Sequence, residues 1–178
     1  MSFSEIAIIG GYNGNFINDV EIISIHQDSI SHIDSSIPSL PKEYWGLGGA
    51  QLSNGDLVVC GGKTGKYRQE DRFSEYLYYK EGSNQWTKVG TMKTTRSHHS
   101  SVWNDGRLLT TGGERYSNGP ISHHEEFSFD GGVKEREEMP IALYKHTTTI
   151  LDQNKMIVCG GKMKSCVREI FSKFRFEK

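Results

Sequence analysis

The most regular feature of the chain is a largely apolar run that ends in two glycines and recurs along the sequence. The runs are IAIIGG, LVVCGG, LLTTGG and MIVCGG, and they end at Gly11, Gly62, Gly113 and Gly161. A short β-prone run bounded by turn residues predicts a buried β-strand. The glycine pair predicts a point where a side chain would not fit or where the backbone needs a positive φ. The intervals of 51, 51 and 48 residues indicate an array of structural repeats.

The third repeat shows most clearly how a unit is built. Residues 98–103 form a β-prone run, Asn104–Gly106 has the composition of a hairpin turn, and RLLTTGG follows as the second strand. A third strand is predicted over residues 123–129, and a fourth at VKEREEMP after a DGG turn. The pattern therefore predicts units of four antiparallel strands.

The other repeats follow this plan with two departures. In the second repeat, the SNG turn at Ser53–Gly55 is followed by FSEYLYYK and by NQWTKVGTM, which carries Trp86. In the fourth repeat, HTTTIL and MIVCGG lie on either side of DQNK. Only nine residues precede Gly10 and 17 follow Gly161, so the first unit lacks its opening strand and the last its closing strand. We therefore expect three, four, four and three strands.

Four-stranded units with a period near 50 and a diglycine closing the second strand resemble kelch repeats. Besides the glycine pairs, the resemblance is carried by Trp86, by Met92 four residues before Arg96, and by Met139 before ALYKH. It covers essentially the whole chain. It implies an all-β, kelch-type β-propeller segment over residues 1–178, with about four repeats (first and last incomplete) at approximately 1–42, 43–93, 94–141 and 142–178. The residues expected to be structural are Gly10, Gly11, Gly61, Gly62, Trp86, Gly112, Gly113, Gly160 and Gly161.

The number of units bears on whether the ring closes. Propellers close with about four to eight blades, so this chain forms either an incomplete ring or an unusually small one, and we expect the incomplete ring. Both ends would then present unpaired strand edges, which favour association. The chain is expected to be part of a longer propeller protein, or to associate with itself or another chain through its open blade edges.

In kelch-like propellers, one ligand face is built from residues just after the glycine pair and just before the first strand of each blade. This set combines aromatic and cationic residues, which are typical of interaction hot spots. Any single member is more simply interpreted as an ordinary solvated loop residue, and Arg96 as a brace between neighbouring blades, but as a set these residues are the expected partner surface. The positions in this sequence are Tyr12, Asn13, Lys63, Glu114, Arg115 and Lys162 after the glycines, and Tyr44, Trp45, Arg96, Ser97, His98, Tyr144 and Lys145 before the strands.

Composition and charge narrow the possible environments. A net charge of −1 gives no reason to expect nucleic acid or an anionic membrane, and no apolar stretch approaches the roughly 20 residues that span a bilayer. The N-terminus lacks the features of a secretory signal, and three cysteines without such a signal favour free thiols in a reducing, cytoplasmic compartment. Cys60 and Cys159 share one slot of two repeats and are expected to be small buried hydrophobes, whereas Cys166 stands alone.

The sequence offers little support for a metal site or for catalysis. The paired histidines at 98–99 and 123–124 fall on the first and third predicted strands, about 10 Å apart, so no metal site is expected. Propeller enzymes of the galactose oxidase type need two Tyr, two His and a Tyr–Cys crosslink, a set that cannot be placed here, and the Asp-box turn of sialidases is absent. The resemblance implies a non-catalytic protein-binding adaptor or scaffold without a cofactor, whose partner is cytoskeletal or related to ubiquitin ligases. A propeller enzyme of either type is the alternative.

Overall fold

The computed structural model describes residues 4–26, 29–33, 35–64, 73–115, 118–152, 155–163 and 171–175. These residues form sixteen β-strands and no helix, and therefore no helix long and apolar enough to cross a membrane. All strand pairs are antiparallel. The strands form four larger sheets and one two-stranded hairpin.

We call the four larger sheets blades 1 to 4. Blade 1 contains β1 (Ser4–Tyr12), β2 (Phe16–His26) and β3 (Ser29–Ile33). Blade 2 contains β4 (Gly48–Gln51), β5 (Leu57–Cys60), β6 (Glu75–Tyr79) and β7 (Thr87–Thr91). Blade 3 contains β8 (Ser100–Asn104), β9 (Arg107–Thr111), β12 (His124–Ser128) and β13 (Gly132–Arg136). Blade 4 contains β14 (Tyr144–Asp152), β15 (Lys155–Lys162) and β16 (Phe171–Arg175).

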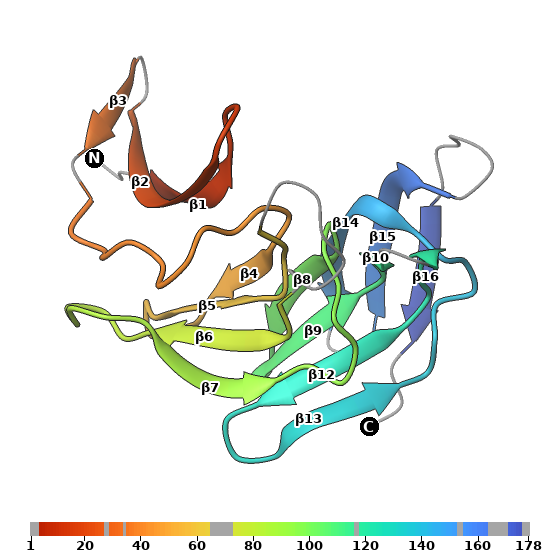
Figure 1. The fold of residues 1–178 in the computed structure, drawn as a ribbon. Helices are drawn as coiled ribbons and strands as arrows, with labels where there is room; N and C mark the ends of the chain where they lie inside the picture. The colour runs from red at the N-terminus through yellow and green to blue at the C-terminus, as the bar shows by residue number, and fades with distance from the viewer. Residues whose placement is uncertain are drawn as a thin grey trace.

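The strand counts of three, four, four and three agree with the sequence prediction. Within each blade the strands are joined in sequence order, and each sheet lies within one predicted unit. The sequence did not predict the hairpin of β10 (Glu114–Arg115) and β11 (Gly119–Pro120), which lies in the loop after the third glycine pair. The four blades fan out from a common centre, where β4 packs against β8 and β8 against β14 (Figure 1). This arrangement is consistent with a β-propeller.

The glycine pairs join each blade to the next. In each of the first three pairs, the second glycine donates its backbone N–H to a carbonyl that precedes the following blade: Gly11 to Tyr44 (2.8 Å), Gly62 to Arg96 (2.9 Å) and Gly113 to Leu143 (2.8 Å). A Cβ on the first glycine of each pair would lie only 2.8, 2.7 and 2.5 Å from the same three oxygens. The first glycines are therefore required for the close approach of neighbouring blades, as the sequence predicts.

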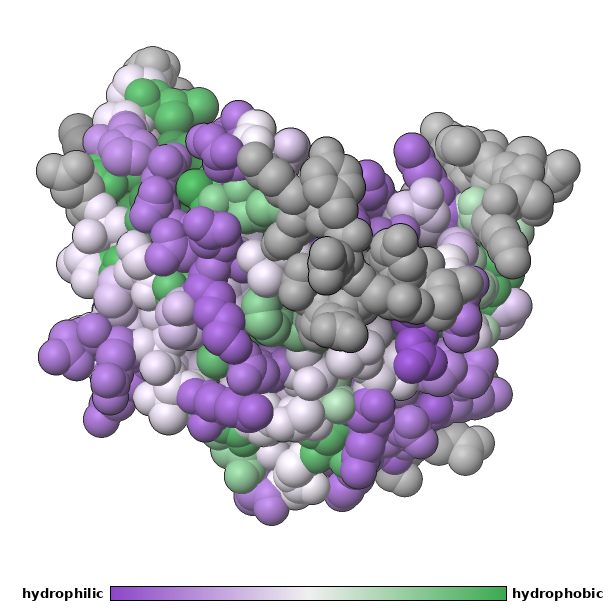
Figure 2. Space-filling view, viewed as in Figure 1, coloured by the Kyte–Doolittle hydropathy of each residue, from purple (hydrophilic) through white to green (hydrophobic). Residues whose placement is uncertain are grey.

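Burial differs between the inner and the outer blades. Strand β5 is buried along its whole length and β9 from Leu108 onward, because each has a blade on both sides. In contrast, Ile6 and Ile8 of β1 are 49% and 44% exposed. Hydrophobic residues gather at the upper left of Figure 2, over the region of blade 1. The prediction of a buried strand before each glycine pair therefore fails for β1, whose outer face has no blade against it among the described residues.

A hydrophobic cluster fills each junction between blades. Trp86 belongs to the cluster between blades 1 and 2, where it is 9% exposed and donates its indole N–H to the carbonyl of Pro38 at 2.8 Å. Between blades 2 and 3, the rings of Tyr76 and Phe127 stack with centroids 4.4 Å apart. Because each cluster draws on two neighbouring blades, burial of apolar surface stabilises the arrangement of the blades as well as each sheet.

Candidate functional site

The structure brings the two predicted sets of loop residues together at one end of the strands. In three blades a residue at the start of the first strand, or three residues before it, pairs with the residue after the glycine pair. The pairs are Trp45 with Lys63, Ser97 with Glu114, and Tyr144 with Lys162. The repeat therefore places a pre-strand and a post-glycine residue side by side in each of these blades.

Neighbouring blades are also linked at this end by their backbones. The N–H of His98 donates to the carbonyl of Gly46 at 2.6 Å, and the N–H of Lys145 donates to the carbonyl of His98 at 2.8 Å. These three residues occupy the same position in blades 2, 3 and 4 and have φ values of +67°, +54° and +55°. A left-handed backbone costs a non-glycine residue about 1–2 kcal/mol, so packing and hydrogen bonds hold His98 and Lys145 in place. The ends of the blades are therefore fixed relative to one another.

Trp45 lies at the centre of a group of side chains from all four blades. Its ring centroid is 5.5 Å from that of Tyr12 and 6.2 Å from that of Phe16, both in blade 1. The imidazole of His98, from blade 3, packs edge-on against Trp45 with centroids 4.7 Å apart and an interplanar angle of 89°. Rings in these tilted and edge-to-face arrangements attract one another beyond simple burial of area.

Charged groups surround this aromatic core. The Lys63 ammonium lies 4.3 Å from the centroid of the Trp45 ring, and the Lys145 ammonium lies 6.0 Å from it. Both distances fall within the cation–π range. Glu114 Oε1 lies 3.4 Å from Lys63 Nζ and 3.0 Å from His98 Nδ1. We call the seven residues Tyr12, Phe16, Trp45, Lys63, His98, Glu114 and Lys145 the loop-end cluster.

The loop-end cluster is accessible to a partner. Tyr12 is 52% exposed, Trp45 is half-buried and Lys145 is exposed. The side chains of Lys63 and Glu114 keep 24% and 21% of their surface exposed although they contact each other. The cluster therefore combines side chains held by their neighbours with a surface that another molecule could cover.

Three residues predicted for the contact surface lie inside the fold instead. Arg96 and Ser97 are fully buried, and Tyr44 is 2% exposed. The Tyr44 ring packs 4.4 Å from that of Phe73, and its hydroxyl donates to Glu75 at 3.3 Å. Burial, together with the Glu75 carboxylate, raises the pKa of Tyr44. We therefore leave these three residues out of the candidate surface.

Arg96 acts as a brace within blade 3. Its guanidinium pairs with the buried carboxylate of Glu125 and also donates to the carbonyls of Thr94 (3.3 Å), Gly112 (3.0 Å) and His123 (2.9 Å). Glu125 in turn accepts the backbone N–H groups of Lys93 at 2.9 Å and Thr94 at 3.0 Å. The geometry therefore supports a structural role for Arg96. From the sequence, Arg96 is expected to brace neighbouring blades, whereas these side-chain contacts lie within blade 3.

The remaining predicted residues, Asn13, Arg115, Tyr144 and Lys162, are not part of the loop-end cluster. Asn13 is exposed, and its side-chain oxygen accepts the N–H of Asn15 at 3.2 Å. Arg115 is half-buried in the β10–β11 hairpin, Tyr144 is half-buried and Lys162 is exposed. In the other direction, sequence reasoning missed Phe16. The signal was present, because the NGN turn sets Phe16 opposite Tyr12 across the β1–β2 hairpin.

Cys60 and His99 form a buried contact between blades 2 and 3, with Sγ 3.4 Å from Nε2. Burial raises the pKa of Cys60 to about 11 and lowers that of His99 to about 3. At neutral pH the pair is therefore a neutral thiol beside a neutral imidazole, whereas a nucleophilic cysteine requires a thiolate. Cys60 is buried as expected, Cys159 is half-buried, and Cys166 lies outside the described residues.

The paired histidines do not assemble a metal site. Strand β9 lies between β8 and β12, as the sequence predicts. Over the part of the chain that the structure describes, no three His, Cys, Asp or Glu side chains are grouped so that they could hold a metal ion.

Comparison with known proteins shows a distant similarity. Kelch-like protein 33 from Homo sapiens is 26% identical to this chain over 127 residues, which is 70% of this chain and 23% of that protein. The chain therefore matches about a quarter of the length of that relative. No family model matches the chain. The similarity agrees with the resemblance to kelch repeats.

Proposed function

We propose that this chain is a non-catalytic protein-binding module of the kelch type and that it binds its partner through the loop-end cluster. The observation that carries the proposal is the environment of Trp45, which contacts aromatic or cationic side chains from all the other three blades. No single blade could form this surface, so it exists only in the assembled fold.

The chemistry of the cluster suits protein recognition. Trp, Tyr and Arg are enriched in binding hot spots, and the large, rigid side chains of Trp and Tyr bury much area at a small cost in conformational entropy. Contacts with Tyr12, Phe16 and His98 restrict the Trp45 ring before any partner arrives, and preorganisation of this kind favours affinity. The ammonium groups of Lys63 and Lys145 lie 4.3 and 6.0 Å from the centroid of this ring and favour a partner segment that carries a carboxylate beside an apolar side chain.

The wider role follows from the resemblance. Kelch-like modules serve as adaptors or scaffolds, and we propose the same role here, with a cytoskeletal or ubiquitin-ligase-related protein as the partner. The distant similarity to kelch-like protein 33 supports a repeat module of this class.

The proposal can be tested by quantitative affinity capture with matched variants. The immobilised chain is exposed to extract of the native cell, and the captured proteins are compared for wild type, Trp45→Ala and Lys63→Ala. Loss of a hot-spot residue costs about 2 kcal/mol or more, so we expect Trp45→Ala to weaken capture about 30-fold. Direct titration of the purified partner then gives the dissociation constants.

Phe129→Ala is the matched control. Phe129 is also an exposed aromatic residue, at 49%, but it lies at the opposite end of the strands, in the turn after β12. This variant should retain the partner that Trp45→Ala loses. Retention of the partner by a Trp45→Ala protein that melts like wild type would refute the proposed surface.

A further inference from the structure

One edge of blade 1 has no strand partner among the described residues. The order of that sheet is β1-β2-β3, so β1 pairs only with β2. In blades 2, 3 and 4, the strand that precedes the glycine pair has an additional neighbour on its inner side, namely β4, β8 or β14. The backbone N–H and C=O groups along the corresponding edge of β1 thus form a template for an added strand.

The three other blades define the register of such a strand. The residue directly before each glycine pair lies opposite Gly48, Ser100 or Thr147. The residue two positions before each glycine pair lies opposite Gly49, Ser101 or Thr148. The residue three positions before it lies opposite Ala50, Val102 or Thr149. The corresponding residues of β1 are Ile9, Ile8 and Ala7. An added strand is therefore expected to have small residues at its first two positions and a small apolar residue or threonine at its third.

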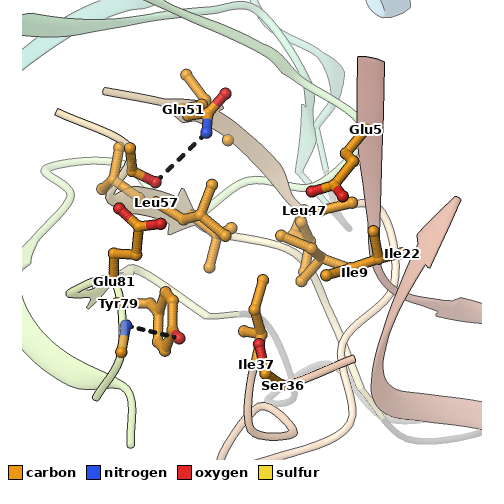
Figure 3. Close-up of a pocket in the computed structure, with 17 residues that line it drawn as sticks. Glu5, Ile9, Ile22, Ser36, Ile37, Leu47, Gln51, Leu57, Tyr79 and Glu81 are labelled. Atoms are coloured by element: carbon orange, nitrogen blue, oxygen red, sulfur yellow. Dashed lines mark hydrogen bonds between the residues drawn. The ribbon is translucent and has the colours of Figure 1, made fainter. Parts of the chain in front are cut away.

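A cavity of about 610 Å³ lies along this edge, between blades 1 and 2 (Figure 3). Its walls are formed by Ile9 and Ile22 of blade 1, Ile37 of the connecting segment, and Leu47 and Leu57 of blade 2. Ligand pockets commonly have volumes of about 300–1,000 Å³, so the space is large enough for several side chains.

The cavity corresponds to the space that the inner strand fills at the next junction. In blade 2, a Cβ on Gly48 would lie 2.6–2.7 Å from atoms of His99 and Ser101, and Ala50 packs in the cluster that contains Leu108. Four residues of blade 2 occupy the positions that His99, Ser101, Leu108 and Thr110 occupy in blade 3. They are Leu47, Gly49, Leu57 and Val59, and all four line the cavity. The first and third side chains of an added strand would therefore face a mainly apolar wall.

A carboxylate on β1 indicates which residue type the added strand should carry at its fifth position. Glu5 of β1 lines the cavity and would lie opposite the fifth residue of an added strand, while Glu81 lies on the other side of the cavity (Figure 3). Within the described part of the chain, neither carboxylate has a cationic partner within 4.0 Å. Opposite charges placed directly across an antiparallel pair are stabilising, so Glu5 favours Lys or Arg at the fifth position.

We propose that an extended segment of a partner protein adds to β1 as an antiparallel strand and fills this cavity. The segment has small residues opposite Ile9 and Ile8, a small apolar residue opposite Ala7 and a basic residue opposite Glu5. Main-chain hydrogen bonds supply affinity and the side-chain positions supply specificity, as in other cases of strand addition. This surface is separate from the loop-end cluster and does not depend on the function proposed for it.

The chain itself supplies a suitable probe. The fluorescently labelled peptide HSSVWK has the sequence of residues 99–104 with lysine in place of Asn104 at the fifth position of the pattern. Binding to the purified full chain is measured by fluorescence anisotropy. Two control peptides carry N-methyl groups on every second backbone amide. One control is methylated on the odd-numbered amides and the other on the even-numbered amides. Only one set faces β1, so we expect one control to bind at least tenfold more weakly and the other to bind within about threefold of the parent. Equal binding of both controls, or no binding of the parent, would overturn the proposal.

Variants of the protein locate the site. Ala7→Arg places a long charged side chain in the cavity and should weaken peptide binding at least tenfold. Ile6→Arg alters the neighbouring residue, which points away from the cavity, and should leave the affinity within about threefold. Glu5→Lys should reverse the preference between HSSVWK and HSSVWE. Each variant is first matched to wild type by thermal melting. Equal binding by Ala7→Arg and Ile6→Arg would place the peptide elsewhere and overturn the proposal.

Sedimentation analysis separates a partner protein from a second copy of the chain. We expect the chain to remain monomeric at the concentrations used for peptide binding. A dimer that the peptide dissociates would assign the β1 edge to a second copy and would overturn the assignment to a different protein.

Discussion

The buried pair of Arg96 and Glu125 yields the sharpest prediction about stability. Both side chains have no exposed surface, and Arg96 also donates to three backbone carbonyls while Glu125 accepts two backbone N–H groups. Replacing Arg96 with Ala would leave the Glu125 carboxylate buried without a counterion and the three carbonyls without this donor. Removing one partner of a buried ion pair costs about 3–5 kcal/mol. That is a large part of the roughly 5–15 kcal/mol by which domains are stable.

The corresponding change in melting temperature is also large. For chains of about 150–250 residues, each kcal/mol shifts the melting temperature by about 2–4 °C, so Arg96→Ala should lower it by roughly 6–20 °C. The double variant Arg96→Met with Glu125→Leu removes both charges and should recover part of the loss, because replacing a whole pair with apolar residues is far less costly than breaking it.

Calorimetry and urea unfolding at pH 7 measure both effects. Lys63→Ala is the control, because this lysine is partly exposed and its removal should change stability by no more than about 1 kcal/mol. An Arg96→Ala protein as stable as the Lys63→Ala protein would refute the assignment of Arg96 as a brace and would return it to the candidate contact surface.

Three further predictions concern the blade junctions and can be checked by the same unfolding measurements. Gly61→Ala should destabilise the fold by at least about 1 kcal/mol more than Gly160→Ala. Both glycines have a positive φ (+62° and +67°), but only at Gly61 would a Cβ meet the next blade. Equal costs would contradict the role of the glycine pair. Burial lowers the pKa of His146 to about 4, so between pH 6.5 and 4 the unfolded chain binds a proton that the folded chain does not, and stability should fall as the pH is lowered. His146→Gln should reduce that fall by up to about 3 kcal/mol, and an unchanged pH profile would count against a buried neutral His146. Trp86→Ala should cost about 3–5 kcal/mol and Trp86→Phe distinctly less, whereas a loss under about 1 kcal/mol for alanine would argue against its place in the core.

The repeat and its glycines could be predicted from sequence because they reflect a demand on the backbone that is local and recurs. The burial of the residues before the first strand of each blade could not be predicted in the same way. One slot holds Tyr44, Arg96 and Leu143, three chemically different residues whose shared contribution is a backbone carbonyl offered to the preceding blade. A polar or aromatic side chain in a loop suggests exposure, and only the apolar Leu143 indicated that this slot is buried.

Six of the seven residues of the loop-end cluster occupy positions that the resemblance to kelch repeats implies for a contact face. Their arrival at one end of the strands could be predicted, since a fold that repeats a unit brings equivalent loops to the same end. Their contacts with Trp45 depend on the angles between blades, and those angles are set by the clusters at the junctions, which involve residues distant in sequence. Phe16 shows the converse case, because a short hairpin places it opposite Tyr12 without any help from the rest of the fold.

Residues 96–98 contribute both to the stability of the fold and to the proposed binding surface. The side chain of Arg96 anchors the interior of blade 3, its carbonyl accepts the N–H of Gly62, and two residues later the N–H of His98 bonds to Gly46 while the ring of His98 packs on Trp45. Arg96 therefore affects partner binding only by holding this segment in place, whereas Trp45 contacts the partner in the proposed complex. A binding defect of an Arg96 variant should disappear once the measured affinity is corrected for the folded fraction, and the defect of Trp45→Ala should not. If both defects vanish after that correction, the loop-end cluster has no direct part in recognition and its side chains serve only to join the blades.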